Sequence, residues 1–312
     1  MIHRPLGGSG IDVSILSLGS WLTFERLPRD TGLEIMRAAR RADITFLDDA
    51  RYNDPTGSAP LETGYSEVVF GELFRAAGWE RQRTIVANKL WFEFWPEQDA
   101  AGEIDASLQR LGFDYLDLEY CAPLPASLAI ADAVSQVGGL IQSGKLRAWG
   151  VLNWSAAQIV EAHRQAVAQK VPPPCAAQLP YSLARREPVE TPEMIAACQS
   201  AGVSVVASST LASGVLTGKY AAPLASGRVA DQLGNPRYQD ALRVAERLQP
   251  VAARLGKSPA AVAIAYALTS PRVASVLFGA TRPDQIHQNC EALGAMEQLS
   301  DAVLDELRAP RA

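Results

Sequence analysis

Three side chains, those of Asp48, Tyr52 and Lys89, have the types and the spacing needed to transfer a proton to a reacting group. Asp48 and Lys89 each stand near the end of a short apolar run, where an ammonium group is costly to bury unless an anion neutralises it. A cation beside a phenol lowers the pKa of that phenol, so Tyr52 would serve as general acid toward a carbonyl oxygen. The alternative is a purely structural Asp48–Lys89 ion pair, because such pairs at strand ends also occur without catalysis.

Short apolar runs rich in β-branched residues alternate with helical patterns along the whole chain. Eight runs predict strands, at 14–19, 44–49, 84–90, 115–121, 147–153, 175–181, 203–209 and 274–280. Apolar residues at three- and four-residue steps predict helices at 31–42, 65–77, 98–111, 129–143, 155–168, 189–201 and 283–295. Eight strands that alternate with helices over 312 residues predict an α/β fold, a (β/α)8 TIM barrel that forms a single domain over 1–312. A doubly wound sheet is the alternative, but the glycine fingerprint expected after its first strand is missing.

A barrel of this kind carries its functional side chains at the carboxyl ends of the strands and in the loops that follow. Asp48, Lys89, Asn153 and Gln178 all stand at or near such ends. The loops 51–64 and 209–238 are long enough to carry function as well.

Composition and charge exclude several classes of partner. The chain has 29 basic and 34 acidic side chains, a net charge of −5, and no run of Lys and Arg that would form a basic stripe for nucleic acid. No stretch of about 18 apolar residues predicts a membrane span. The first ten residues lack the apolar core of a secretory signal. We therefore expect a cytoplasmic protein whose partners include neither nucleic acid nor membrane.

The chain also lacks the patterns of a metal centre or of a histidine-activated nucleophile. Its three histidines stand far apart, its four cysteines form no C-x-x-C pair, and no G-x-S-x-G motif occurs. The segment 214–219 falls one residue short of a phosphate-binding loop, and Tyr220 stands where a Ser or Thr must bind magnesium. Any nucleotide must therefore be held in another way.

Six motifs follow one another along nearly the whole chain. They lie at 4–21 (R-P-L-G-G-S-G-I-D-V-S-I-L-S-L-G-S-W), 64–71, 104–118, 143–155, 211–220 and 278–289 (F-G-A-T-R-P-D-Q-I-H-Q-N). In this order and spacing they resemble the aldo-keto reductase family, most closely the branch that includes the potassium-channel β subunits and related bacterial reductases. The resemblance implies an N-terminal β-hairpin before the barrel, and the reduction by NADPH of a carbonyl group of a small-molecule substrate.

The resemblance also assigns roles by position. Asp48, Tyr52 and Lys89 match the catalytic residues, with hydride passing from the nicotinamide to the carbonyl carbon while Tyr52 protonates the oxygen. Asn153 and Gln178 match the positions that hydrogen-bond the carboxamide. The other cofactor positions that it implies are Ser20, Trp21, Ser208, Ser209, Leu211, Ser213, Lys219, Gly279, Thr281, Arg282, Gln285, Gln288 and Asn289. The substrate-pocket positions are Trp91, Tyr120 and Ala122. At the adenosine end Arg282 suits a 2′-phosphate, although an exposed, solvated charge is the alternative.

Three departures from the family pattern alter the expected site. Ala122 stands where the family has its catalytic histidine, and Tyr52 comes one residue early, in D-D-A-R-Y rather than D-T-A-x-x-Y. Ser208 replaces the aromatic ring that stacks on the nicotinamide, a platform worth on the order of 1 kcal/mol. We therefore expect a substrate other than a simple aldehyde: a bulkier ketone, an imine or a conjugated C=C. The aromatic residues of 91–95 either line an apolar pocket for it or pack within their own loop.

Two other functions are compatible with these residues. One is a nicotinamide-binding sensor or regulatory subunit with weak or vestigial reductase activity, which the missing histidine and the missing ring favour. The retention of Asp48, Tyr52 and Lys89 favours an enzyme, because a pure binder has no need of a buried lysine beside a phenol. The other is a barrel enzyme that uses no nicotinamide, which would require the resemblance of 278–289 to be accidental.

Overall fold

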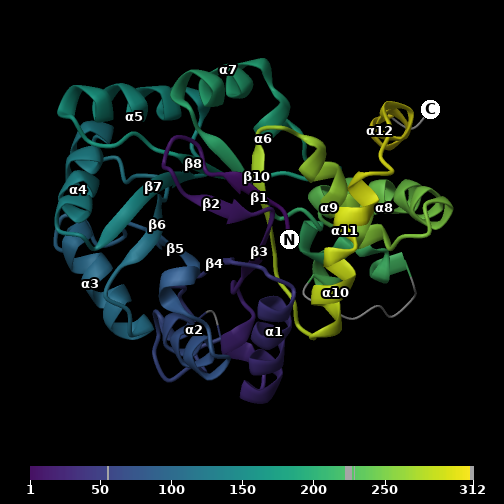
Figure 1. Cartoon of the computed structure of the whole chain (residues 1–312), viewed down its shortest axis with the longest axis horizontal. Coiled ribbons are helices and arrows are strands. Elements are labelled where there is room, and N and C mark those ends of the chain that lie inside the picture. The colour runs from purple at the N-terminus through teal and green to yellow at the C-terminus, as the bar shows by residue number, and fades with distance from the viewer. Residues whose placement is uncertain (55, 222–226, 228, 310–312) are drawn as a thin grey trace.

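The computed structural model describes residues 1–54, 56–221, 227 and 229–309, and within them eight parallel strands close into a barrel. Their order around the barrel follows the chain, and β10 closes the ring against β3 (Figure 1). The strands are β3 (Leu16–Gly19), β4 (Phe46–Asp48), β5 (Ile85–Leu90), β6 (Leu116–Cys121), β7 (Leu146–Leu152), β8 (Ala176–Pro180), β9 (Ser204–Ser208) and β10 (Val273–Phe278). Each begins and ends within two residues of the run that predicted it. The predicted (β/α)8 barrel is confirmed.

An antiparallel hairpin, β1 (His3–Pro5) and β2 (Asp12–Ser14), precedes the barrel, as the resemblance implied. It lies across the middle of the strand ring in Figure 1. Its apolar residues Leu6, Ile11 and Val13 pack onto the side chains inside the barrel and close the end at which the strands begin. The opposite end, where the strands finish, is left for function, and we call it the mouth.

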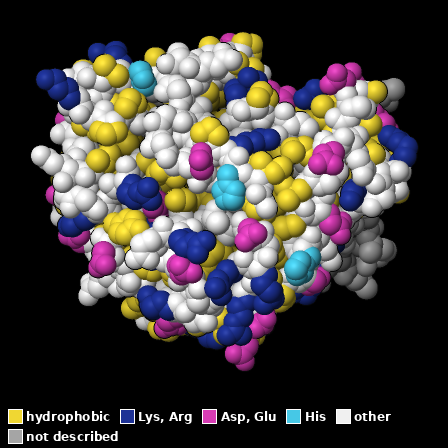
Figure 2. Space-filling view, viewed as in Figure 1, with side chains coloured by type: hydrophobic (Ala, Val, Ile, Leu, Met, Phe, Trp, Pro, Cys, Tyr) yellow, Lys and Arg dark blue, Asp and Glu magenta, His cyan; other side chains and the backbone are white. Residues whose placement is uncertain are grey.

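Helices surround the barrel and cover its outer face (Figure 1). They are α1 (Arg29–Arg41), α2 (Tyr65–Ala76), α3 (Ala100–Leu111), α4 (Ile130–Gln142), α5 (Ala156–Gln169), α6 (Glu187–Glu190), α7 (Pro192–Ala201), α8 (Pro236–Arg254), α9 (Pro259–Thr269), α10 (Asp284–Cys290), α11 (Ala292–Met296) and α12 (Asp301–Arg308). Local sequence sets several of their starts: Ser155 and Gln158 form a capping box at α5. No described helix combines the length and apolar character that crossing a membrane requires. On the face seen in Figure 2, basic and acidic side chains are interspersed.

The sequence patterns did not predict α8, α9 or α12. Every residue of α9 from Ala261 to Leu268 is at most 1 % exposed, because the helix packs against β10, α8 and α11. A helix buried on all sides shows no 3.6-residue apolar period, so its pattern carries no signal. The expected loop 209–238 contains the short turns η3 (Ala212–Thr217), η4 (Lys219–Ala221) and η5 (Ala230–Gln232) and the start of α8. Positions 222–226 and 228 of that loop, and 55 of the loop 51–64, lie outside the described residues.

Candidate active site

The ammonium group of Lys89 lies at the mouth, beside the end of the neighbouring strand. Its Nζ donates hydrogen bonds to Asp48 Oδ1 and, at 2.9 Å, to the main-chain oxygen of Asp49. Asp48 pairs with Ala87 in the β4–β5 register, so Lys89, two residues further along β5, points to the same inner side. Both charged side chains are 3 % exposed, and each therefore depends on the other for neutralisation.

Gln178 joins this pair from the opposite side of the barrel. Its Nε2 donates to Asp48 Oδ2 at 2.9 Å, and the side chain is buried. Both oxygens of Asp48 therefore accept a hydrogen bond, which holds the carboxylate and, through it, Lys89. Gln178 therefore uses one N–H of its side-chain amide to hold Asp48. This structural role is additional to the contact with the cofactor that the resemblance implies for Gln178.

Tyr52 lies over Lys89, even though it comes one residue early in its loop. Lys89 Nζ is 5.8 Å from the centroid of the Tyr52 ring. Burial raises the pKa of Tyr52 well above its usual range, and the negative charges of Asp48 and Asp49 raise it further. The expectation that Lys89 lowers the pKa of Tyr52 is therefore wrong. Asp48 compensates the ammonium charge of Lys89, so burial and the carboxylates determine the direction. Tyr52 keeps its proton at neutral pH, as a proton donor must.

Arg51 holds the loop that carries Tyr52. The Arg51 side chain is 5 % exposed; its guanidinium donates to Thr63 Oγ1 at 2.7 Å and to Glu93 Oε2 at 2.7 Å. Its central carbon lies 5.2 Å from the centroid of the Phe94 ring. One cation thus ties both ends of the loop 51–64 to the aromatic loop after β5, and it does so beside Tyr52.

We expect Arg51→Met to lower the free energy of unfolding by about 1–3 kcal/mol, because two hydrogen bonds of a buried charge are lost. Urea denaturation measures the change. Arg37→Met is the matched control, because Arg37 pairs with Glu34 on the exposed side of α1. We expect it to lower the free energy of unfolding by less than about 0.5 kcal/mol. Equal effects of the two substitutions would show that Arg51 does not hold the loop.

A cavity of about 440 Å³ opens beside Tyr52, between the loops that follow β4, β5 and β6. Trp91 lines it, and the Tyr52 and Trp91 rings meet edge to face with their centroids 6.4 Å apart. Tyr120 and Ala122 are not among its lining residues. Tyr120 is fully buried inside the barrel, with its ring 6.0 Å from Lys89 Nζ, and Ala122 is 1 % exposed. The apolar walls come instead from Phe92, Pro123, Leu124 and Pro125.

Asp49 is a residue whose role sequence reasoning did not identify. Its side chain is fully buried and accepts a hydrogen bond from Ser20 Oγ. Burial raises the pKa of Asp49 well above its usual range, and the nearby charge of Glu67 adds to the rise. Ser20, expected among the cofactor residues, thus commits its hydroxyl to the interior. The signal in the sequence was the second aspartate of D-D-A, where the family has D-T-A.

We expect Asp49→Asn to stabilise the protein increasingly as pH rises from 4 to 8. The folded-state pKa of Asp49 lies above its unfolded value of about 4, so the folded state binds the extra proton. The stability that Asp49 contributes is therefore present below about pH 4 and declines as pH rises toward the folded-state pKa. Asparagine mimics the protonated carboxyl group and does not titrate. Melting temperatures of the unmodified protein and of Asp49→Asn, measured from pH 4 to pH 8, test this prediction, with Asp114→Asn as the exposed control. A difference in melting temperature that does not change with pH would contradict it.

The segment after β9 carries several expected cofactor residues in an unusual backbone conformation. Ser209, Ala212 and Ser213 have φ angles of 54°, 47° and 57°, in the left-handed region that costs energy for residues other than glycine. A Cβ on Gly214 would lie 3.1 Å from Lys219 Nζ, so the lysine passes close to this backbone. Ser208 ends β9, and Leu211 precedes the turn η3. These positions lie within one short segment after β9, and their role as a pyrophosphate cover stays a prediction.

The remaining expected cofactor residues lie after β3, β7 and β10. Asn153 is exposed, has a φ of 56°, and its main-chain N–H donates to Gln178 O at 3.0 Å. Gly279 and Thr281 lie exposed after β10, Asn289 is buried, and Trp21 is half exposed after β3.

The start of α10 is held by its own side chains. Gln285 Oε1 accepts from the main-chain N–H groups of Thr281 and Arg282, at 2.7 and 3.2 Å. The exposed guanidinium of Arg282 makes two bonds of 3.1 Å to Asp284, and Gln288 donates to the same carboxylate at 3.2 Å. Arg282 is therefore an exposed arginine paired with Asp284, and its expected role toward a 2′-phosphate stays a prediction.

Comparison with known proteins identifies the group that shares this architecture. A model of the Aldo/keto reductase family matches residues 15–311. A protein of Oryza sativa subsp. japonica named probable voltage-gated potassium channel subunit beta is 33 % identical, over 99 % of this chain and 96 % of its own length. Its namesake in Arabidopsis thaliana is 34 % identical, over 98 % and 95 %. A putative voltage-gated potassium channel subunit beta of Schizosaccharomyces pombe is 28 % identical, over 97 % and 91 %. These matches confirm the resemblance drawn from the motifs, including its branch.

Proposed function

The chain belongs to the aldo/keto reductase family, and on this premise we propose that it is an NADPH-dependent oxidoreductase acting on a small molecule. The group reduced is a carbonyl or a related imine or conjugated C=C bond. The observation that carries the proposal is the arrangement at the mouth: Lys89 is held by Asp48 beneath Tyr52, beside a cavity of about 440 Å³. A pair with only a structural role would not require a phenol over the ammonium group.

In this proposal Tyr52 is the proton donor. The raised pKa keeps its hydroxyl protonated until a substrate oxygen gains negative charge beside it. Lys89 stabilises the phenolate that remains after the transfer, while Asp48 keeps the ammonium group in place. A bound nicotinamide supplies the hydride. With Ala122 in place of a histidine, the proton comes from Tyr52 without a second donor from that position.

Support for a dinucleotide comes from the distribution of the cofactor positions. The cofactor positions lie at or just after the carboxyl ends of β7, β8, β9 and β10, which are consecutive in the barrel: Asn153, Gln178, the segment 208–219 and the segment 279–289. Tyr52, in the loop after β4, and Lys89, in β5, lie on the other half. An extended dinucleotide along one half of the rim would thus bring its reactive end to the proton donor on the other. The side-chain amides of Asn153 and Gln178 suit the carboxamide at one end of a dinucleotide. The hydroxyl groups and cations of 208–219 and 279–289 suit its phosphates.

The cavity supports a substrate that is larger and more apolar than a simple aldehyde. Its walls combine the rings of Tyr52, Trp91 and Phe92 with two prolines and a leucine, and Arg51 and Glu93 are already paired at its edge. A cavity of this volume, with aromatic and proline walls and with Arg51, Asn53 and Glu93 among its polar lining residues, favours a ketone or conjugated compound carrying a ring or a branched chain.

Fluorescence titration of the purified protein with NADPH and with NADH tests the proposal. We expect NADPH to bind more tightly, and Arg282→Gln to reduce its advantage, because Arg282 would face the 2′-phosphate. Arg83→Gln, at an exposed arginine on the other half of the chain, is the control and should leave both affinities unchanged. Absence of binding by either nucleotide would refute the proposed function.

A second candidate is a nicotinamide-binding regulatory subunit with weak activity. Two observations favour it: the relatives are named as channel β subunits, and the chain has Ala122 and Ser208 where the family has a histidine and a stacking ring. Single-turnover oxidation of bound NADPH, measured with a panel of ketones, imines and enones, separates the candidates. Turnover within seconds supports the enzyme, and tight binding without turnover supports the regulatory subunit.

A further inference from the structure

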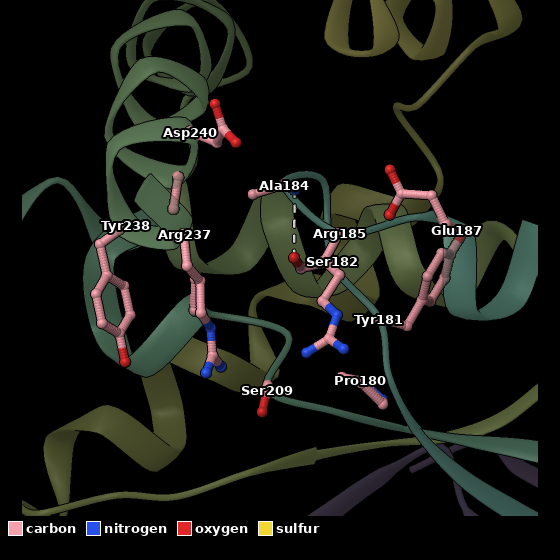
Figure 3. A pocket seen from close by; sticks show the side chains of 12 residues that line it. Pro180, Tyr181, Ser182, Ala184, Arg185, Glu187, Ser209, Arg237, Tyr238 and Asp240 are labelled. Carbon is pink, nitrogen blue, oxygen red and sulfur yellow. Dashed lines mark hydrogen bonds between the residues drawn. The ribbon is translucent and has the colours of Figure 1, made fainter. Parts of the chain in front are cut away.

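A second cavity, of about 220 Å³, opens at the carboxyl ends of β8 and β9, away from the Tyr52 cavity (Figure 3). Its walls come from the loop after β8, the first residues after β9 and the first turns of α8. Three segments that are distant in sequence thus surround a space the size of a small anion or metabolite. The roles assigned by resemblance include only Ser209 among its lining residues.

Two guanidinium groups face this cavity from different elements. Arg185 extends from the loop after β8 and Arg237 from the first turn of α8, and in Figure 3 both groups are directed toward Ser209. The carboxylates of Glu187 and Asp240, which also border the cavity, point to the other side of this view. Positive charge is therefore concentrated on one side of the cavity.

Neither Arg185 nor Arg237 forms an ion pair with any residue that the structure describes, whereas their neighbours do. Arg186 lies 3.8 Å from Glu190, and Arg243 pairs with Asp240, which is thereby engaged elsewhere. Two like charges that share a cavity repel each other, and an anion between them would remove that repulsion. Both arginines are exposed, and the guanidinium carbon of Arg237 lies 5.3 Å from the centroid of the Tyr238 ring, a contact that leaves its charge uncompensated. The pairing pattern therefore leaves two positive charges for an anionic ligand.

Ser209 supplies a hydroxyl on the same side. Its φ of 54° lies in the left-handed region, a strained conformation for serine that tends to occur at functional sites. Ser182 also borders the cavity, where its Oγ accepts from the N–H of Ala184 at 3.2 Å (Figure 3). That contact leaves the Ser182 hydroxyl proton available to a further acceptor. We propose that this cavity binds a phosphate or carboxylate group, with Arg185 and Arg237 as its charged ligands and Ser209 as a hydrogen-bond donor.

This chemistry has two possible sources, a phosphate of the cofactor or the acidic group of a separate small molecule. The proposal does not require that the protein be a reductase, because it rests on the cavity and its cations. It can therefore fail while the proposed function stands, and it can hold while that function fails.

The first experiment titrates the full chain with inorganic phosphate by calorimetry, against sodium chloride at matched ionic strength. We expect binding that weakens by about tenfold or more in R185Q/R237Q, because each lost contact is a charge-assisted hydrogen bond. R164Q/R254Q removes two exposed arginines elsewhere and should bind phosphate as the unmodified protein does. Unchanged circular dichroism and melting temperature without phosphate would verify that R185Q/R237Q is folded. Absence of phosphate binding, or equal binding in R185Q/R237Q, would overturn the proposal.

The second experiment identifies the source of the anion. NADPH titrations by fluorescence are repeated with and without phosphate, in the unmodified protein and in R185Q/R237Q. If a cofactor phosphate occupies the cavity, phosphate competes with NADPH and the double substitution weakens NADPH binding. If a separate molecule occupies it, NADPH affinity is the same in all four titrations. Either pattern supports the site once phosphate binding depends on the two arginines.

Discussion

Replacement of Tyr52 with phenylalanine is expected to slow carbonyl reduction by about 10²- to 10⁴-fold while NADPH binding stays unchanged. The substitution removes only the hydroxyl that donates the proton and keeps the ring, together with its edge-to-face contact with Trp91. The raised pKa of Tyr52 means that the hydroxyl, and not a phenolate, is the form lost. Single-turnover NADPH oxidation gives the rate, and fluorescence titration gives the affinity.

The control for this experiment is Tyr65→Phe, which removes a hydroxyl on the surface of α2. Tyr65 OH accepts a hydrogen bond from Arg29 at 2.9 Å, so a polar contact is lost there too, away from the mouth. We expect that variant to reduce its substrate at the unmodified rate. If Tyr52→Phe kept more than about a tenth of the rate, the proton would have to come from another group.

Lys89→Met is expected to lower the free energy of unfolding by about 3–5 kcal/mol and to abolish reduction. The substitution leaves Asp48, which is 3 % exposed, with a buried charge and, among the described residues, Gln178 as its one remaining side-chain hydrogen-bond donor. It also removes the cation that would stabilise a phenolate on Tyr52. Urea denaturation measures the loss of stability, and single-turnover kinetics measures the loss of activity.

The double variant Asp48→Asn/Lys89→Met separates charge from packing. It removes both buried charges, while the amide oxygen of an asparagine still accepts from Gln178 Nε2. We expect it to recover most of the stability lost in Lys89→Met, because no unpaired charge remains, and to stay inactive. A double variant as unstable as the single one would show that the cost comes from packing around Lys89 rather than from Asp48.

The barrel was predictable because its strands are buried on both faces and therefore appear as short apolar runs. The helices that escaped prediction include α8, α9 and α12, and complete burial explains this for α9. The helix α9 is enclosed on every side, so its sequence lacks an apolar period. The start of α8 does carry a local signal, Asn235 as the N-cap followed by Pro236, which the expected loop 209–238 passed over.

For the candidate site, the sequence predicted which residue types stand at the strand ends. Asp48 and Lys89 were expected to meet because adjacent parallel strands end side by side, and they do. The pKa of Tyr52 was expected to fall and instead rises, since burial and two carboxylates outweigh an ammonium group that Asp48 already compensates. Asp49 and Ser20 were assigned no contact with each other, yet they pair in the interior.

The sequence by itself determined the alternation of strands and helices, the family and the positions at which polar side chains meet the mouth. These features depend on short-range periodicity and on residue types, which are read along the chain. Four features emerge only in the folded barrel: the hydrogen bond from Gln178 to Asp48, the raised pKa of Tyr52, the ion pair of Arg51 with Glu93, and the convergence of Arg185 and Arg237 on one cavity. Each of these features depends on distances between segments that are far apart in sequence, and closure of the barrel sets those distances. Closure also buries the charged groups, and burial governs the energy of each charge.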